Sequence, residues 1–391
     1  MSHVTSEDMS RFYSTMKIIK KLEELKKFIP LSETDFIHAQ ETVMKTGYPL
    51  AVSASFVNLI LHSISEKAPE GNEFSLTKNA LLRQILPSTE EQNNPEYFTL
   101  DPLKEQDPIF FPPGHDTPRL QNSRLLHKYQ GRALLLVSPR CFGNCRFCFR
   151  RHTFRSDTET ECNHAELNSC TKTQKNENLH ASFFTELSQI SQNTTLSEII
   201  LSGGDPLTLS DDALIQLIKN LSEIPHIRRI RIHTRATVFA PERISSHFLS
   251  ALKEISSSTG KLIFFVLHIN HPSELHSPAG NAALSEMLDH GFPLLQQGVL
   301  LRGVNDNLET LVALYENLIS RRIIPYYLHQ LDRVIGAAHF EVDENVGQEL
   351  IMKLKTVLPG YAIPRYVREI PGMPAKIEIS SQNHFLESFS Y

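Results

Sequence analysis

The stretch CFGNCRFCFRRH, residues 141–152, places three of the chain's five cysteines within eight positions. Cys141, Cys145 and Cys148 are too closely spaced for pairwise disulfides, and the odd total does not suit a disulfide framework. Their spacing instead indicates thiolates that converge on one metal centre. His152 would complete a Cys3His zinc site, whereas an iron–sulfur cube held by three cysteines would keep one iron open. The stretch alone leaves both alternatives open.

The sequence around the cysteines predicts a parallel sheet. An apolar run at 132–138 leads into them, and similar runs follow at 197–203, 228–234, 262–269, 295–301 and 323–330. Amphipathic patterns with helical spacing lie between and after these runs, at 181–192, 211–224, 241–255, 281–291, 307–322 and 345–360. Continuous apolar strands that alternate with helices predict right-handed βαβ units. Six units are fewer than the eight of a closed barrel, so we expect an α/β fold with an open, partial (β/α)6 barrel.

The predicted domain organisation has three parts. Residues 1–125 read as an N-terminal helical subdomain and linker, residues 126–345 as the partial barrel, and residues 346–391 as a C-terminal segment. Residues 157–178 are polar and without period, which predicts a surface insertion in the barrel. The insertion contains Cys162, His164 and Cys170, but it lacks a fourth ligand and regular spacing, so we interpret these residues as incidental.

The composition excludes several classes of protein. The chain has 391 residues, of which 40% are hydrophobic and 21% charged, as in folded globular proteins. The net charge of −5 argues against a general nucleic-acid binder. No apolar run approaches the roughly 20 residues that cross a bilayer, and the N-terminus lacks the pattern of a signal peptide. We therefore expect a cytoplasmic protein without membrane contact.

Polar and glycine-rich residues recur where the predicted strands end. SGGDP (202–206) follows the second strand, HTR (233–235) ends the third, HINH (268–271) ends the fourth, and LHQLD (328–332) ends the sixth. The carboxyl ends of barrel strands meet on one face, where ligands bind. The glycines of SGGDP would also suit a simple tight turn. The recurrence at five strand ends, the cysteine loop included, nevertheless predicts a site on this face.

Two resemblances give these motifs a meaning. The cysteine spacing, with aromatic Phe147 before the last cysteine, resembles the radical S-adenosylmethionine (SAM) enzymes. That resemblance implies a [4Fe–4S] cluster on Cys141, Cys145 and Cys148, whose open iron binds SAM. It also implies that the GGD residues Gly203, Gly204 and Asp205 hold the SAM amino group. The segments PYYLHQLDRVIGAAHF (325–340) and REIPGMPAK (368–376) further resemble the lysine 2,3-aminomutase family.

The family resemblance implies a pyridoxal phosphate (PLP) site. Lys376 matches the lysine that attaches PLP covalently, and the cofactor-binding positions of the family correspond to Lys128, Tyr129, Arg132 and Gln297. Two cations and a phenol suit a phosphate and a pyridine ring, although an exposed basic turn is the simpler interpretation of the first three. Gly298 departs from the family, because it replaces a serine that resembles a phosphate ligand.

The substrate-binding residues follow from the same resemblance. Arg150 matches the arginine that binds the substrate carboxylate, and Asp332 matches the aspartate that binds the ε-ammonium. The family's second carboxylate is replaced by Glu369, as in the branch that makes (R)-β-lysine for elongation factor P. Two carboxylates would select a cationic amino acid, because a neutral one would leave buried charges unpaired.

The sequence thus predicts an isomerase that converts L-α-lysine to (R)-β-lysine with a [4Fe–4S] cluster, SAM and PLP. An external electron donor would reduce the cluster, and a lysyl-ligase and elongation factor P would use the product. Three alternatives stay open. They are an aminomutase for another cationic amino acid such as arginine, a non-catalytic zinc or iron–sulfur interaction module, and an enzyme weakened by Gly298 and the insertion.

Overall fold

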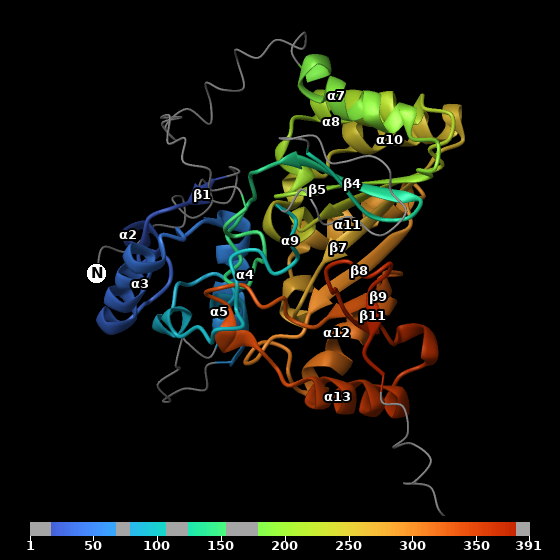
Figure 1. The fold of residues 1–391 in the computed structure, drawn as a ribbon. Coiled ribbons are helices and arrows are strands. Elements are labelled where there is room, and N and C mark those ends of the chain that lie inside the picture. The colour runs from blue at the N-terminus through green and yellow to red at the C-terminus, as the bar shows by residue number, and fades with distance from the viewer. Residues whose placement is uncertain (1–16, 68–78, 107–123, 154–178, 381–391) are drawn as a thin grey trace, which may run out of the picture.

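A nine-stranded sheet forms the centre of the computed structural model, which describes residues 17–67, 79–106, 124–153 and 179–380. The strand order is β11-β10-β9-β8-β7-β6-β5-β4-β3 (Figure 1). Strands β4 to β10 run parallel, whereas β3 and β11 are antiparallel to their neighbours and form the two edges. The strands are β3 (Leu125–Tyr129), β4 (Arg132–Ser138), β5 (Glu198–Gly203), β6 (Arg229–Thr234), β7 (Leu262–His268), β8 (Leu294–Val299), β9 (Ile324–His329), β10 (Arg365–Arg368) and β11 (Ile377–Glu378).

The predicted α/β fold with an open sheet is confirmed. The six predicted strands correspond to β4–β9, each displaced by at most two residues. The parallel strand β10 and the edge strands β3 and β11 were not predicted. They are short, and β3 mixes apolar with polar residues, so only pairing with a neighbour defines them. No hydrogen-bonded pairing between β3 and β11 occurs in the described part of the chain, so the barrel is open.

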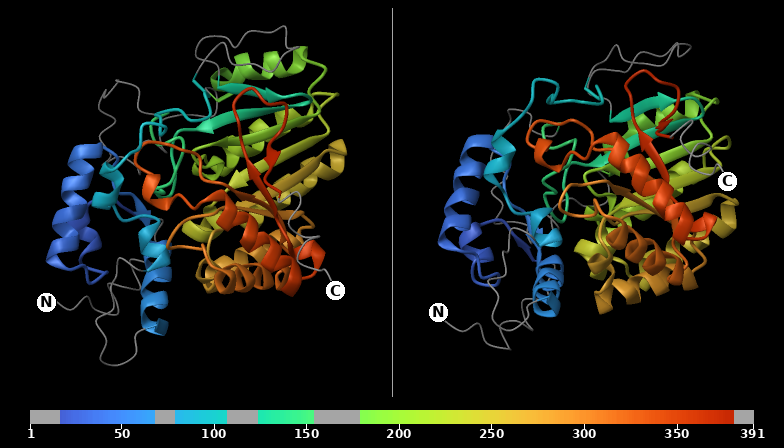
Figure 2. Two further views of the ribbon diagram at one scale, coloured as in Figure 1. Left: turned by 60° about the horizontal axis from the view of Figure 1, so that its bottom comes forward. Right: turned by 90° about the horizontal axis from the view of Figure 1, so that it is seen from below.

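Helices follow the parallel strands and cover the sheet (Figures 1 and 2). They are α7 (Leu179–Gln192), α8 (Asp211–Ser222), α9 (Ala236–Phe239), α10 (Ser246–Thr259), α11 (Pro278–Asp289), α12 (Leu308–Ser320) and α13 (Glu344–Val357). The helix predicted from residue 241 starts later, because Pro241–Arg243 forms a separate 3-10 turn. Ser245 then caps α10 by accepting a hydrogen bond from the backbone N–H of Phe248. Gly260, with φ of 68°, ends this helix.

The N-terminal helices lie together beside the sheet (Figures 1 and 2). They are α2 (Leu22–Leu25), α3 (Glu33–Thr46), α4 (Ala54–Lys67) and α5 (Ala80–Arg83), and a short antiparallel pair joins β1 (Ile18–Ile19) to β2 (Val52–Ser53). Phe56 of α4 stacks on Phe239 of α9 with ring centroids 4.2 Å apart. Buried residues of both parts belong to one hydrophobic cluster, so the helices are packed firmly against the barrel.

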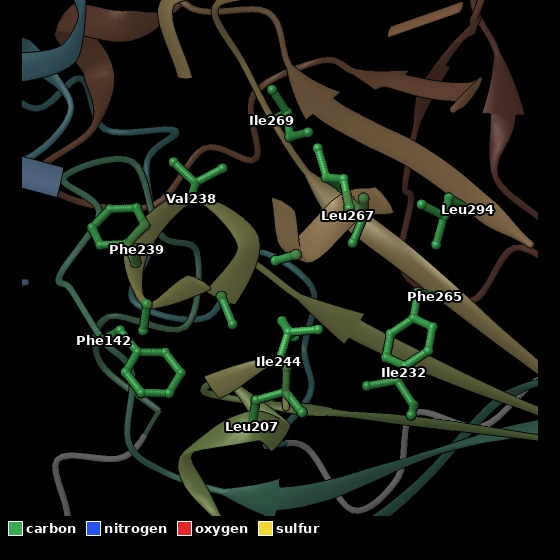
Figure 3. Packing of buried hydrophobic residues seen from close by; sticks show 14 of the residues in the cluster. Phe142, Leu207, Ile232, Val238, Phe239, Ile244, Phe265, Leu267, Ile269 and Leu294 are labelled. Atoms are coloured by element: carbon green, nitrogen blue, oxygen red, sulfur yellow. The ribbon is translucent and has the colours of Figure 1, made fainter. Parts of the chain in front are cut away.

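The core owes its density to fully buried strand residues. Ile232 of β6, Phe265 and Leu267 of β7 and Leu294 of β8 are buried on neighbouring strands, and Phe239 lies beside Val238 in another part of the same cluster (Figure 3). Burial of each such side chain contributes about 1.5–3 kcal/mol, so the strands hold their ends in fixed positions. Those fixed ends position the site described below.

Some sequence predictions concern parts of the chain that this structure leaves open. The insertion at 157–178, with Cys162, His164 and Cys170, lies outside the described residues. The domain boundaries at residues 125 and 345 stay predictions. Within the described ranges, every helix is too short or too polar to cross a bilayer.

Candidate active site

The cysteine loop lies directly after β4. Cys141, Cys145 and Cys148 are free thiols, and the Cys145 sulfur accepts a hydrogen bond of 2.8 Å from the Arg235 guanidinium. Burial raises the pKa of Cys148 to about 11, and the neighbouring Cys145 adds to the rise. Among the described residues, no three His, Cys, Asp or Glu side chains are close enough to hold one metal ion.

Two buried arginines, Arg146 and Arg151, anchor the cysteine loop to Glu91. Glu91 accepts two hydrogen bonds of 2.7 Å from Arg146 and another of 2.7 Å from Arg151, and all three side chains are fully buried. Arg151 therefore has a structural role in fixing the loop. His152 contacts the carbonyl oxygen of Ile335 at 3.2 Å.

The GGD turn after β5 packs against the entrance of the cysteine loop. Gly203 has φ of 119°, a conformation that favours glycine. A Cβ atom at Gly204 would lie 2.1 Å from the carbonyl oxygen of Arg140, so no larger residue fits. The Asp205 carboxylate is buried and accepts hydrogen bonds from Thr234 Oγ1 and from the backbone N–H of Arg235. Asp205 thus ties the end of β5 to the end of β6, and its predicted contact with SAM stays a prediction.

Five charged side chains form one chain of ion pairs in which positive and negative groups alternate. Arg150 donates to both oxygens of Glu105, at 2.6 and 2.9 Å. Lys128 Nζ bridges Glu105 at 2.6 Å and Glu369 at 2.8 Å. The other oxygen of Glu369 accepts from Lys376. The structure therefore joins Arg150, Lys128, Glu369 and Lys376, four predicted residues that are far apart in sequence.

This chain of charges spans the open side of the barrel. Lys128 belongs to β3, one edge of the sheet, while Glu369 follows β10 and Lys376 precedes β11 at the other edge. The pair Lys128–Glu369 consequently connects the two edges that no backbone hydrogen bond joins in the described part of the chain. Burial would raise the pKa of Glu369, but Lys128 and Lys376 outweigh it and hold that pKa well below its usual range.

Tyr129 and Arg132 lie at the same edge. The Arg132 guanidinium sits over the Tyr129 ring, 4.7 Å from its centroid. Burial raises the pKa of Tyr129 well above its usual value, and the nearby Glu369 carboxylate adds to the rise. The two residues therefore lie beside the same charged cluster, and their predicted role in binding PLP stays a prediction.

Asp332 follows β9 and lies close to the same cluster. Burial raises the pKa of its carboxyl to about 7, and the Glu369 carboxylate adds to the rise. Within the described ranges, no ion pair involves the Asp332 carboxylate. Its predicted role in binding the substrate ammonium stays a prediction.

Three residues of the site had no role assigned from sequence. Glu105 precedes β3, in a segment without regular pattern, so nothing in the sequence marked it. His233 and His329 end β6 and β9, and this strand-end position was the available signal. Burial lowers the pKa of His329 to about 3, with Lys376 adding to the effect, and burial also holds the pKa of His233 well below its usual value. Both rings are thus neutral in the site.

The strand β8 contributes Gln297, whose amide nitrogen lies 3.5 Å from His233 Nδ1. At the adjacent Gly298, a Cβ atom would lie 2.8 Å from the carbonyl oxygen of Ile269 and 3.1 Å from the side-chain oxygen of Asn270. The neighbouring atoms therefore leave no space for a side chain at Gly298. A serine at this position would require the backbone to shift.

The chemistry of these residues fits the predicted cofactors. Three free thiols follow β4, and the close approach of Gly204 to Arg140 forms a turn beside them. Across the open side of the barrel, Lys376 has an amine for a covalent bond, and Lys128 and Arg132 provide charges for a phosphate.

Comparison with known proteins places the chain in a class of enzymes, the isomerases. The L-lysine 2,3-aminomutase of Escherichia coli K12 is 35% identical over 93% of this chain and 93% of its own length, and that of Haemophilus influenzae is 34% identical over 90% of each. The chain belongs to the L-lysine 2,3-aminomutase family. No protein-family profile matches it. Among solved structures, Streptococcus suis SuiB bound to S-adenosylmethionine aligns with 14% identity and a TM-score of 0.41 over 62% of this chain and 51% of SuiB, too weak to carry an argument.

Proposed function

We propose that this chain converts L-α-lysine to (R)-β-lysine with a [4Fe–4S] cluster, SAM and PLP. The observation that carries the proposal is the chain of ion pairs from Arg150 through Lys128 and Glu369 to Lys376. Beside it lies the carboxyl of Asp332, which forms no ion pair with the residues that the structure describes. Groups that recognise a carboxylate, a phosphate and an ammonium are thereby brought within one buried site.

The protein would bind the cofactors at two walls of this site. Bound cluster and SAM supply a radical that abstracts hydrogen, and PLP carries the migrating nitrogen. One wall consists of the cluster-binding thiols and the SAM-binding turn, formed by Cys141, Cys145, Cys148, Gly203, Gly204 and Asp205. The other wall consists of the PLP-binding residues Lys376, Lys128, Tyr129 and Arg132, with Gln297 from β8.

The substrate would lie between these walls. Arg150 has the planar guanidinium that suits a carboxylate, and Asp332 and Glu369 suit the ammonium at the far end of lysine. Because the pKa of Asp332 is about 7, an approaching ammonium would favour its ionised form. A neutral amino acid would provide no such cation for the Asp332 carboxylate.

The direct test is turnover by the reconstituted enzyme. Protein loaded anaerobically with iron and sulfide is incubated with SAM, PLP, a chemical reductant and L-lysine, and the products are separated by chiral chromatography. We expect (R)-β-lysine from the wild type, and none from Lys376→Arg, which keeps the charge but does not attach PLP. L-arginine is tested in parallel. Conversion of arginine in preference to lysine, or no β-amino acid from either, would refute the proposal.

We further propose that the product is used by a lysyl-ligase that modifies elongation factor P. The support is Glu369, because this branch of the family also carries glutamate at the position of the second carboxylate. Because α-lysine and β-lysine have the same mass, intact-mass measurement cannot distinguish them. Modified elongation factor P made with and without this enzyme is therefore hydrolysed, and its attached amino acid is separated chirally. An unchanged ratio of the two isomers would contradict this step.

A further inference from the structure

Glu105 lies in the chain of ion pairs between Arg150 and Lys128, two cations that the proposed function assigns to different ligands. It accepts from Arg150 Nε and Nη2 at 2.6 and 2.9 Å, and from Lys128 Nζ at 2.6 Å. We propose that Glu105 is a positioning residue that fixes Arg150 for the substrate carboxylate and Lys128 for the cofactor phosphate. This inference rests on the proposed function, which supplies those two ligands.

The backbone around Glu105 is itself anchored to the site. The Asp101 carboxylate accepts hydrogen bonds from the backbone N–H of Glu105 at 3.0 Å and from the following residue at 2.7 Å. Thr99, two residues before Asp101, donates a backbone hydrogen bond of 2.9 Å to Arg333 and accepts one of 3.0 Å from Ile335. These bonds connect the Glu105 segment to the loop that follows Asp332. The carboxylate is therefore held from a fixed backbone, as positioning requires.

Glu105 also determines which donors of Arg150 are available. A guanidinium has five N–H groups. Two of them bind Glu105, and Nη1 donates to Ser202 Oγ at 3.1 Å and to the carbonyl oxygen of Gly203 at 3.3 Å. Among the described residues, this leaves one N–H of Nη2 for a substrate carboxylate. The guanidinium plane is thus set before any substrate binds.

A competing interpretation is that Glu105 occupies the substrate's place and is displaced by it. Its side chain is only 2% exposed, and although burial would raise its pKa, Arg150 and Lys128 lower that pKa to about 2. Breaking a buried pair of this kind costs a factor of roughly 10²–10³ in the equilibrium, which a single substrate carboxylate would have to repay. Displacement is therefore disfavoured. Without Glu105, Lys128 and Arg150 would also repel each other, since Arg150 acts to lower the pKa of Lys128.

The experiment compares Glu105→Gln with Glu186→Gln. Glu186 is a matched control, because it is buried and paired with Arg124 at 3.2 Å, outside the site. PLP affinity is measured by absorbance titration, and lysine affinity by equilibrium dialysis without reductant. We expect Glu105→Gln to weaken both by about tenfold or more at an unchanged iron content, because each cation loses a charge-assisted hydrogen bond. Glu186→Gln is expected to leave both affinities unchanged.

Three outcomes would overturn the inference: tighter lysine binding in Glu105→Gln, which indicates displacement; weaker binding of only one ligand; or a lower unfolding midpoint with both affinities intact. Should glutamine prevent folding, Glu105→Asp replaces it, because it keeps the charge but is too short to bridge both cations. It should then weaken both affinities at a normal unfolding midpoint. Neither binding measurement needs turnover, so a wild type that makes no β-lysine refutes the proposed function separately.

Discussion

Replacing Glu91 with glutamine is expected to destabilise the protein strongly. Within the described part of the chain, Glu91 is the only carboxylate that forms ion pairs with the buried Arg146 and Arg151. Arg146 donates to both of its oxygens at 2.7 Å, and Arg151 donates at 2.7 Å. The backbone N–H of Ser88 adds a further bond at 3.2 Å. Burial would raise the pKa of Glu91, but Arg146 and Arg151 lower it, so the native group is ionised.

The magnitude follows from what glutamine cannot do. Its amide keeps one acceptor oxygen, and its NH₂ group points a donor at an arginine donor. At least one guanidinium is then left buried without a counter-charge. Removing one partner of a buried ion pair costs about 3–5 kcal/mol, a large part of the free energy of unfolding of an ordinary protein. Since Arg146 belongs to the cysteine loop, iron content after reconstitution should fall as well.

The assay is urea unfolding of the metal-free protein, with Glu90→Gln as the control. Glu90 pairs with Arg83 at 3.0 Å but is 49% exposed, so its loss should cost less than about 1 kcal/mol. The lowered pKa of Glu91 means that its contribution is present above the unfolded-state pKa and lost as the pH falls through the folded-state pKa. The gap between wild type and Glu91→Gln should therefore narrow in acid. A difference below 1 kcal/mol at neutral pH would refute the reasoning.

Three other predictions follow from the site. Gly204→Ala should lose SAM binding in equilibrium dialysis and about 1–3 kcal/mol of stability, because the new Cβ meets a backbone oxygen at 2.1 Å, whereas Gly360→Ala, with open space around it, should behave as wild type. Asp332→Asn should raise the thermal midpoint relative to wild type more at pH 8 than at pH 5. The wild-type carboxyl, whose pKa is raised to about 7, contributes stability below its unfolded-state pKa that is lost as the pH rises through 7, and equal shifts at both pH values would contradict this. Lys128→Met should cost about 3 kcal/mol in urea unfolding, since two buried carboxylates lose a shared cation, and an unchanged midpoint would argue against the bridge between the sheet edges.

The sequence predicted the regular part of the fold well, because that part has local causes. Long apolar runs and helical periodicity gave β4–β9 and the helices that follow them. The short strands β3, β10 and β11 were not predicted, because a strand of two to five residues is too short to show a hydrophobic period. The start of α10 was misplaced because Ser245, four residues after Pro241, provides the cap.

The candidate site likewise contains residues that the sequence predicted and residues that it did not. Residues within recognisable motifs, such as Cys141 and Lys376, could be predicted as site residues because the residues next to them in the sequence form the motif. Glu105 was not, because its role consists of contacts with Arg150 and Lys128, which are distant along the chain. A buried glutamate in an irregular segment has no sequence pattern. Its importance is visible only from the charges around it.

By itself, the sequence determined the α/β class, the cysteine loop and the family to which the chain belongs. The tertiary structure alone decided that residues from both edges of an open sheet meet in one chain of ion pairs, from Arg150 to Lys376. The physical reason is the distance along the chain over which each interaction acts. Hydrophobic periodicity and turn chemistry act between near neighbours, whereas the pairing of buried charges depends on which side chains the folded backbone brings within about 3 Å of each other.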